Sequence, residues 1–266
     1  MTAKKVRADE LVVQQGLADS RSKAKAMIVA GDVRSGDRMI QKPAELLDPD
    51  LPLELRAKLP FVSRGGLKLD HALSEFDIDV AGVVAADLGA STGGFTDVLL
   101  QRGAGRVYAV DVGYGQLDYR LRSDDRVVVM ERVNARHLDA LPEPVEFVCV
   151  DVSFISLEHI LPVAARLLID GGDVVTLIKP QFEAGKEQVG KGGVVRDERT
   201  RKSVVERVVS LAVDSGLGLH GLTRSPITGP AGNVEYLAWF RNGVPASNAG
   251  DLIAKVFATK DRARES

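Results

Sequence analysis

The chain has 266 residues, of which 45% are hydrophobic and 27% charged, so it is long enough for a buried core and belongs to the globular class. Its net charge of −2 does not indicate binding to nucleic acid. The charge is unevenly distributed, since residues 1–64 carry twelve lysines and arginines against nine acids, a net charge of +3, and the remaining residues carry −5. With no secretory leader and no apolar run long enough to span a membrane, we expect a cytoplasmic protein.

The single cysteine, Cys149, excludes an intramolecular disulfide and a zinc site built from cysteines. It lies in the apolar pattern of residues 147–150, which is typical of a buried strand, so we expect an inert thiol rather than a nucleophile. The four histidines show no metal-ligand spacing, and we predict no metal site.

The first segment combines two helical patterns with short strands around a turn. Gly16 and Gly31 are placed to stop the helices, and Ser20 is placed to cap the second one. We expect helices at residues 6–15 and 21–30, strands at Val33 and at residues 39–40, and the turn at residues 35–37.

The second of these helices carries Arg21, Lys23 and Lys25 in its first turns, where the helix dipole favours acids. Basic residues placed against the dipole indicate an external anion, although charge alone fits a solvated basic face equally well. The string over residues 16–28, followed by Gly31-Asp32-Val33, resembles the S4 family of small RNA-binding domains. That resemblance implies that the helix contacts structured RNA, and it disfavours the alternative of a helical protein-docking domain.

A proline-rich stretch separates this segment from the rest of the chain. Pro49, Pro52 and Pro60 precede Ser63-Arg64-Gly65-Gly66, a composition typical of a linker, and an amphipathic helix follows over residues 66–76. We therefore predict an α+β RNA-binding domain over residues 1–58, an interdomain linker over residues 59–65 and a larger domain over residues 66–266.

From residue 83 onward, short apolar runs alternate with helical patterns. Strands are predicted at residues 83–88, 107–111, 127–130, 147–152, 174–178, 219–223 and 235–240, and helices at residues 95–102, 157–168 and 199–215. This alternation favours an α/β fold of the Rossmann-like type, with a mostly parallel sheet and helices on both of its faces.

A glycine-rich turn over residues 89–94 joins the first of these strands to its helix. Such a turn is needed where a ligand approaches the backbone and meets helix N–H groups. Its spacing differs from the dinucleotide fingerprint Gly-x-Gly-x-x-Gly, so nicotinamide is the weaker alternative.

Three polar residues near this turn favour S-adenosylmethionine. Asp111 closes the second strand, where an acid can hold two ribose hydroxyls. Asp87 and Asn134 fit contacts on the methionine and adenine sides, and acids suit a sulfonium cation. The predicted cofactor-binding residues are Asp87, Gly89, Ala90, Ser91, Thr92, Gly93, Gly94, Phe95, Asp111, Asn134 and Asp151.

Four polar residues are expected to meet at one edge of the sheet. Asp151 and Lys179 follow neighbouring strands, and Glu235 begins a strand that would reach the same edge if it runs antiparallel. Lys68 starts a helix whose N-terminal end should lie near that edge. A ribose hydroxyl is a poor nucleophile that must be oriented and relieved of its proton, which suits this set. From these residues alone, two surface salt bridges are an equal alternative.

The chain order of Lys68, Asp151, Lys179 and Glu235 matches the Lys-Asp-Lys-Glu catalytic set of the FtsJ-like ribose methyltransferases. The shared strings, at residues 63–69, 87–97, 151–156 and 179–183, resemble more narrowly the TlyA family, historically named haemolysins. This resemblance spans the chain and implies a class I methyltransferase fold with a seven-stranded sheet.

The same resemblance implies S-adenosyl-L-methionine as cofactor and methylation of cytidine 2′-hydroxyls in 16S or 23S ribosomal RNA, or both. Lys179 would activate the hydroxyl, Asp151 and Lys68 would orient it, and Glu235 would hold the lysines. The partner would be ribosomal RNA or a ribosomal subunit, with no obligate protein partner evident.

The glycine-rich stretch over residues 184–195 is either a flexible connector or a lid that grips RNA, and its basic residues favour the lid. Phosphate contacts would position the RNA, and a target base inside a helix would have to be flipped out. The predicted RNA-binding residues are Arg7, Ser20, Arg21, Lys23, Lys25, Arg64, Lys186, Lys191 and Arg196.

Two other functions are weighed against this one. An RNA-binding assembly factor would keep the fold without methylating, but it would have no need of the four polar groups. A membrane-lytic protein, as the older family name suggests, would need an apolar span or a strongly amphipathic basic helix, and the sequence shows neither.

Overall fold

The structure is a computed structural model that describes residues 5–36, 38–55 and 59–258. The chain divides into two compact units, Met1–Leu59 and Pro60–Ser266, and each has its own apolar core. Asp37 of the predicted turn and the predicted domain boundary at residue 58 lie outside the described residues.

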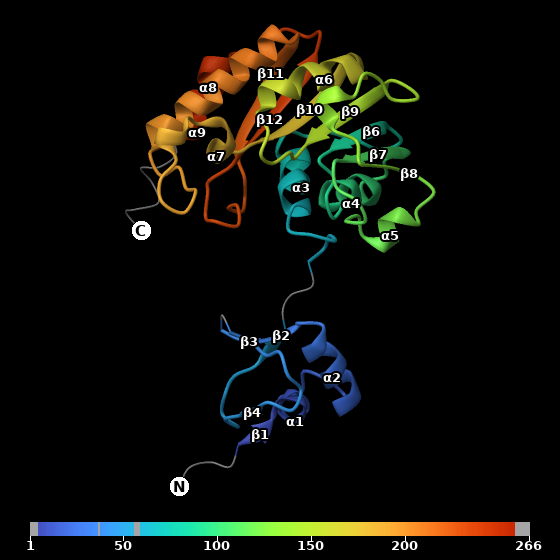
Figure 1. Ribbon diagram of the computed structural model, residues 1–266, viewed down its shortest axis with the longest axis vertical. Coiled ribbons are helices and arrows are strands. Elements are labelled where there is room, and N and C mark those ends of the chain that lie inside the picture. Colours follow the sequence, from blue (N-terminus) through green and yellow to red (C-terminus); the bar gives the residue numbers. More distant parts are fainter. Residues whose placement is uncertain (1–4, 37, 56–58, 259–266) are drawn as a thin grey trace. The chain divides into compact units, whose positions relative to one another are not determined.

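The first unit packs two short helices against two small antiparallel sheets (Figure 1). Its elements are β1 (Val6–Arg7), α1 (Ala8–Gln14), α2 (Arg21–Val29), β2 (Val33–Ser35), β3 (Arg38–Met39), β4 (Leu46–Leu47) and β5 (Glu54–Leu55). The second helix and its cap are confirmed, since Ser20 Oγ accepts a hydrogen bond from Lys23 N at 3.3 Å. The first helix begins two residues later than predicted, because Val6 and Arg7 are extended and pair with β4.

The second unit is built on a seven-stranded sheet in the order β11-β12-β10-β9-β6-β7-β8. The strands are β6 (Val84–Leu88), β7 (Arg106–Asp111), β8 (Val127–Glu131), β9 (Val145–Val150), β10 (Leu168–Ile178), β11 (Leu217–Arg224) and β12 (Tyr236–Asn242). Neighbours from β10 to β8 are parallel, and β12 is antiparallel to both β10 and β11. All seven predicted strands are confirmed, and so is the mostly parallel α/β architecture.

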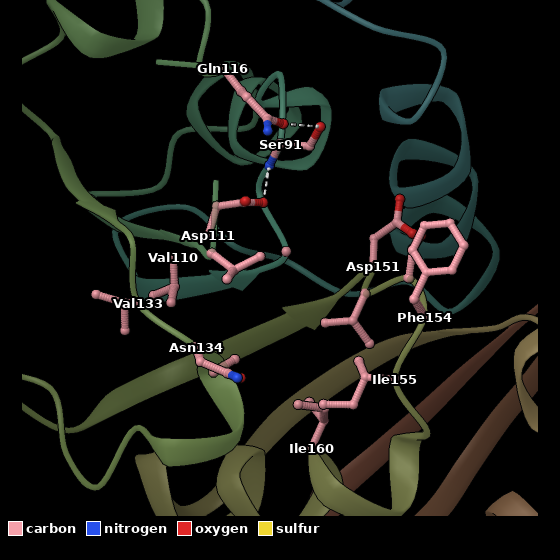
Figure 2. A pocket seen from close by; sticks show the side chains of 15 residues that line it. Ser91, Val110, Asp111, Gln116, Val133, Asn134, Asp151, Phe154, Ile155 and Ile160 are labelled. Atoms are coloured by element: carbon pink, nitrogen blue, oxygen red, sulfur yellow. Dashed lines mark hydrogen bonds between the residues drawn. The ribbon is translucent and has the colours of Figure 1, made fainter. Parts of the chain in front are cut away.

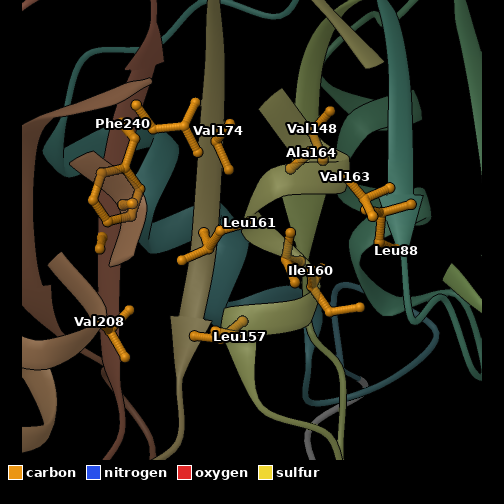
Figure 3. Packing of buried hydrophobic residues seen from close by; sticks show 14 of the residues in the cluster. Leu88, Val148, Leu157, Ile160, Leu161, Val163, Ala164, Val174, Val208 and Phe240 are labelled. Atoms are coloured by element: carbon orange, nitrogen blue, oxygen red, sulfur yellow. The ribbon is translucent and has the colours of Figure 1, made fainter. Parts of the chain in front are cut away.

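Helices cover both faces of this sheet (Figure 1). They are α3 (Gly66–Glu75), α4 (Gly94–Gln101), α5 (Tyr119–Arg122), α6 (Leu161–Leu167), α7 (Pro180–Glu183), α8 (Glu198–Asp214) and α9 (Ala249–Ala258). On one face, α3 and α4 bury Leu69 and Val98. On the other, α6, α8 and α9 cover a larger core, in which Leu161 lies near Val174 and Phe240 (Figure 3). Each such side chain contributes about 1.5–3 kcal/mol through burial.

Two helices differ from the sequence-based expectation. The helix predicted over residues 157–168 is a 3₁₀ turn, Leu157–His159, followed by α6, because Pro162 in the first turn of α6 has no N–H to continue a longer helix. The short helix α7 was not predicted, since four residues are too few to show a helical period. It directly follows Lys179 and therefore shapes the site.

The sheet topology brings polar residues from separate parts of the second unit to one edge. The glycine-rich turn follows β6, Asp111 ends β7, Asp151 follows β9 and Lys179 follows β10. Because β12 is antiparallel, Glu235 at its start lies at the same edge. This is the edge at which α/β sheets bind their ligands.

Candidate active site

Asp151 and Lys179 form a close ion pair because β9 and β10 are parallel neighbours. Lys179 Nζ lies 2.6 Å from Asp151 Oδ1, and it donates hydrogen bonds to Val152 O (2.9 Å) and Ser153 Oγ (2.8 Å). Three oxygens therefore surround a buried nitrogen. This geometry suits an ammonium group, which donates three hydrogen bonds and accepts none.

Lys68 and Glu235 form a second buried ion pair. Lys68 Nζ donates to Glu235 Oε2 at 2.6 Å, from the first turn of α3 to the residue that precedes β12. Gln181 of α7 donates its amide Nε2 to the other carboxylate oxygen, Glu235 Oε1, at 3.2 Å. Glu235 is thus held from both sides, by a cation and by an amide.

The two ion pairs are neighbours. Gln181, two residues after Lys179, bonds Glu235, and a Cβ atom built on Gly65 at the start of α3 would lie 3.9 Å from Asp151 Oδ2. The alternative of surface salt bridges is wrong, since Lys68 and Lys179 are 8% exposed and Glu235 is 2% exposed. Burying ion pairs costs desolvation energy that their attraction barely offsets, so two adjacent pairs indicate a functional site.

A cavity of about 350 Å³ adjoins the Asp151–Lys179 pair (Figure 2). It opens between the ends of β6, β7 and β9, and Figure 2 shows Asp111 and Asn134 on one side of it with Asp151 and Phe154 on the other. Five of the predicted cofactor-binding residues line it, namely Gly89, Ser91, Asp111, Asn134 and Asp151.

The backbone holds the Asp111 carboxylate in place. Ser91 N donates to Asp111 Oδ2 at 2.8 Å, and Gly113 N donates to Oδ1 at 2.6 Å. A carboxylate can accept about four hydrogen bonds, so each oxygen keeps capacity for a hydroxyl group. Asn134 Oδ1 accepts from Arg136 N at 3.0 Å, which leaves the amide nitrogen to face a ligand. These groups fit the ribose and base of a nucleoside.

Six of the predicted cofactor-binding residues do not line this cavity: Asp87, Ala90, Thr92, Gly93, Gly94 and Phe95. A Cβ atom on Gly93 would meet Leu121 Cδ1 at 2.2 Å, and one on Gly94 would meet Ser63 Oγ at 2.2 Å. These glycines therefore allow close packing of α4 against its neighbours. Their contact with a cofactor stays a prediction.

Asp87 is fully buried beneath the glycine-rich turn. Its Oδ2 accepts from Thr96 N (2.9 Å) and Thr96 Oγ1 (2.7 Å), whereas its Oδ1 has no hydrogen-bond partner among the described residues. Burial raises the pKa of the Asp87 carboxyl to about 7, the hydrogen bonds from Thr96 oppose this rise, and the nearby charge of Asp151 adds to it.

This shift predicts a pH-dependent cost of folding. An Asp87 pKa raised from 3.8 to about 7 means that the folded state binds the proton more tightly, so its contribution to stability is present below pH 4 and is lost as pH rises through 7. The loss is on the order of 4 kcal/mol. In urea denaturation from pH 4 to 8, the stability of Asp87→Asn relative to the wild type should rise by about 1.4 kcal/mol per pH unit between pH 4 and 7 and level off above pH 7. A constant difference between the two proteins would contradict the shift.

Three of the predicted RNA contacts in the first unit, Arg7, Arg21 and Lys23, form ion pairs within the unit. Asp9 is fully buried, Arg7 Nη2 lies 2.9 Å and Arg21 Nη2 lies 3.3 Å from its Oδ2, and Arg21 also pairs with Glu10 at 2.9 Å. Lys23 pairs with Asp19 at 2.8 Å, and Lys25 is exposed. Arg21 is half-exposed, so its guanidinium can still meet a phosphate at its outer side.

The remaining predicted RNA contacts lie on the second unit and are exposed: Arg64, Lys186, Lys191 and Arg196. Lys186 and Lys191 belong to the glycine-rich stretch, and Arg196 directly follows it. The stretch is folded rather than an extended connector. Gly190 pairs with Val194, and the buried Asn233 accepts from Val195 N (3.0 Å) and donates to Gly193 O (2.8 Å). The stretch is therefore anchored two residues before Glu235.

A groove of about 570 Å³ lies between this stretch and the ion pairs, and Phe154, Gln181, Phe182 and Lys186 line it. Sequence reasoning assigned no role to its two aromatic rings. Phe154 is 90% exposed, has φ +64°, and its ring centroid lies 4.9 Å from that of Phe182. The signal available in the sequence was a phenylalanine three residues after a strand-end aspartate, in a loop expected at the ligand-binding edge of the sheet.

Two classes of feature are absent from the described ranges. No helix there combines the length and apolar character required to cross a membrane. Within the same part of the chain, no group of three or more histidine, cysteine or acidic side chains is arranged to hold a metal ion.

Comparison with known proteins identifies the family. Residues 61–242 match the FtsJ-like methyltransferase family, and residues 6–51 match the S4 domain. The 16S/23S rRNA (cytidine-2′-O)-methyltransferase TlyA of Mycobacterium tuberculosis is 47% identical over 243 residues, covering 90% of this chain and 91% of that protein. Hemolysin A of Brachyspira hyodysenteriae is 44% identical over 242 residues, covering 88% and 99%.

A solved Streptococcus thermophilus chain that bears the hemolysin name is 46% identical to this chain. The two superpose with a TM-score of 0.75, covering 96% of this chain and 95% of the other. Relatives under both names thus share one two-domain architecture. The chain belongs to the TlyA family of ribosomal RNA 2′-O-methyltransferases, in which an S4 domain precedes an FtsJ-like methyltransferase domain.

Proposed function

We propose that this protein transfers a methyl group from S-adenosyl-L-methionine to the 2′-hydroxyl of cytidine in 16S or 23S ribosomal RNA, or both. The observation that carries the proposal is the placement of two buried ion pairs, Lys179–Asp151 and Lys68–Glu235, beside a nucleoside-sized cavity. The cytidine and the ribosomal RNA rest on the activity named for the 47% identical mycobacterial relative.

The cavity residues would hold the cofactor by its nucleoside end. The fixed carboxylate of Asp111 would accept hydrogen bonds from two ribose hydroxyls, and Asn134 would contact the adenine. Asp151 lines the same cavity and would place negative charge towards the cationic end. When bound, the cofactor supplies an electrophilic methyl group on a sulfonium.

The polar groups would prepare the hydroxyl for in-line attack. Lys179, held by Asp151, Val152 O and Ser153 Oγ, would place its positive charge beside the hydroxyl oxygen and stabilise the negative charge that develops on it. Lys68 would orient the ribose from the opposite side, while Glu235 holds Lys68. The proton would leave through Asp151, whose partly exposed carboxylate lines the cavity and can pass it on to solvent.

The groove beside the site suits an unstacked nucleotide. The exposed ring of Phe154, which packs against the half-buried ring of Phe182, presents an aromatic surface on which a base can stack, at about 1–3 kcal/mol per base. Lys186 lines the same groove and can meet a phosphate. Flipping of the target base into this groove would bring its ribose to the ion pairs.

The deciding experiment follows labelled methyl from S-adenosylmethionine into purified ribosomal subunits and naked ribosomal RNA, with nucleoside analysis of each. Labelled 2′-O-methylcytidine would establish the reaction and its substrate. Absence of label on every RNA, with cofactor binding shown by calorimetry, would favour an assembly factor. Release of dye from liposomes at low protein concentration would instead favour the lytic activity suggested by the hemolysin name of a relative.

A prediction for the first unit follows from its basic helix. Replacing Arg21 and Lys23 together by alanine should weaken RNA binding and reduce the slope of log K against log salt by about 0.9 for each lost phosphate contact. The measurement is RNA affinity from 50 to 200 mM salt. Because Arg21 also pairs with Asp9, the thermal midpoint must be followed, and Lys42→Ala, an exposed lysine of the same unit outside the predicted contacts, is the control. An unchanged slope would show that RNA docks elsewhere.

A further inference from the structure

We propose that Glu183 is a positioning residue that fastens the loop over residues 151–157, which carries Asp151, Ser153 and Phe154, to the helix that follows Lys179. This inference rests on the proposed function and deepens it, since it concerns the same site. Glu183 touches neither the cavity nor the groove described above. It would act through the groups that it holds.

Glu183 ends α7 and is 8% exposed. Its Oε1 accepts a hydrogen bond from Leu157 N at 2.8 Å, and its Oε2 accepts one from Ser156 Oγ at 2.9 Å. Arg207 of α8 supplies the balancing charge, with Nη2 at 3.1 Å from Oε2 and a further hydrogen bond to the Glu183 carbonyl. One buried carboxylate thus ties three segments together: the loop after β9, the helix after β10, and α8.

The loop that Glu183 fastens holds a strained and exposed residue. Phe154 has φ +64°, a conformation that a residue with a Cβ adopts only when its surroundings enforce it. Its ring rests on Phe182, the neighbour of Glu183 in α7. The carboxylate accepts hydrogen bonds from Ser156 and Leu157 and thereby fixes the C-terminal end of this loop. The N-terminal end is fixed by Asp151 N, which donates to Leu88 O at 3.0 Å. Both ends of the Phe154 loop are therefore anchored.

The hydrogen bonds of Glu183 also control the distance between Lys179 and Asp151. Lys179 lies four residues before Glu183, and its Nζ bonds Val152 O and Ser153 Oγ of the fastened loop. If the loop moved away from α7, the Lys179 nitrogen would lose oxygens that position it. A displacement of about 1 Å at a reacting group can lower a rate by about 10²-fold.

The test compares Glu183→Ala and Glu183→Gln with the wild type in methyl transfer to the RNA that the wild type modifies. Glu183→Ala should lower kcat about 30–100-fold, and the Kd for S-adenosylmethionine should rise by a smaller factor, because the loop that Glu183 fastens lines only one side of the cofactor cavity. Glu183→Gln keeps an oxygen for Leu157 N and should recover a large part of the lost kcat. Hydrogen exchange of the Leu157 amide, which donates to Glu183, should accelerate in the alanine variant.

Asp173 provides a matched control at the opposite edge of the sheet. Its Oδ1 accepts from Trp239 Nε1 at 2.7 Å and pairs with Arg241 Nε at 3.3 Å, so Asp173→Asn also disturbs a partly buried carboxylate network. This variant should lose stability without the fall in kcat and without faster exchange at Leu157. The positioning role is overturned if Glu183→Ala has the kcat of the wild type. It is also overturned if the kcat of Glu183→Ala falls no further than the kcat of Asp173→Asn when the two variants are equally stable. An inactive wild type overturns the proposed function instead.

Discussion

Replacing Lys179 by alanine is expected to slow methyl transfer at least about 10³-fold and to leave the affinity for RNA nearly unchanged. The rate falls because the variant removes the ammonium group that Asp151, Val152 O and Ser153 Oγ hold within 2.9 Å and that is proposed to stabilise charge on the attacking oxygen. RNA affinity is retained because Lys179 is 8% exposed and offers little surface to a phosphate. The single-turnover rate and the RNA Kd, measured on the same preparation, check both parts.

A second substitution separates two roles that Lys179 can have. Lys179→Arg keeps a permanent positive charge but cannot accept a proton. Partial activity in the arginine variant would favour charge stabilisation by an ammonium, as the three surrounding oxygens suggest, whereas inactivity equal to that of alanine would favour proton abstraction. Lys202→Ala, an exposed lysine of α8 paired with Glu206, is the control and should keep full activity. Retained activity in Lys179→Ala would remove this residue from the reaction.

The sheet edge could be predicted from the sequence because it follows from strand order alone. Parallel strands end at a common edge, so placing Asp151 and Lys179 after strands was enough to bring them together. Glu235 needed one further assumption, an antiparallel last strand, which the structure confirms. The resemblance to a known family added the chain order of the four polar residues, which no periodicity contains.

Contacts that depend on side-chain partners could not be predicted in this way. Arg7 and Arg21 read as free cations in the sequence, yet both turn towards the buried Asp9, whose own position is decided by the packing of α1. Gly93 and Gly94 are predicted to contact the cofactor, but no pattern in the sequence indicated that their Cβ positions lie against leucine side chains and Ser63. In each case the contact is made by a residue that no local sequence pattern links to the one it contacts.

The short elements and the groove escaped prediction for a related reason. A four-residue helix such as α7 has no measurable period, and the left-handed backbone of Phe154 carries no local sequence signature such as glycine. Both features depend on long-range contacts, among them the hydrogen bonds of Glu183 to Ser156 and Leu157. The left-handed Phe154 and the helix α7, which sequence reasoning missed, therefore lie together at the groove beside the ion pairs.

Gly89→Ala is expected to lower both stability and activity, because Gly89 is where the glycine-rich turn contacts the loop over residues 151–157. Gly89 has φ +94°, and a Cβ atom there would lie 2.7 Å from Asp151 O and 3.2 Å from Val152 N. Both neighbours are backbone atoms, so relief requires the Asp151 segment to shift. The strained φ and the overpacking together should cost on the order of 3 kcal/mol. The shift would also move Asp151 relative to Lys179 and lower kcat by about 10²-fold or more.

Gly103→Ala separates the backbone strain from the close approach. Gly103 has φ +91°, almost the same as Gly89, but the nearest atom to its Cβ position is Ala81 Cβ at an ordinary 3.6 Å. It should therefore lose about 1–2 kcal/mol in urea denaturation and keep its kcat. If both variants lose the same stability and the same activity, the approach of Gly89 to Asp151 has no special role. If only Gly89→Ala loses activity, Gly89 is required because the ends of β6 and β9, which carry the glycine-rich turn and Asp151, must lie in contact. That contact would couple cofactor binding to the geometry of methyl transfer.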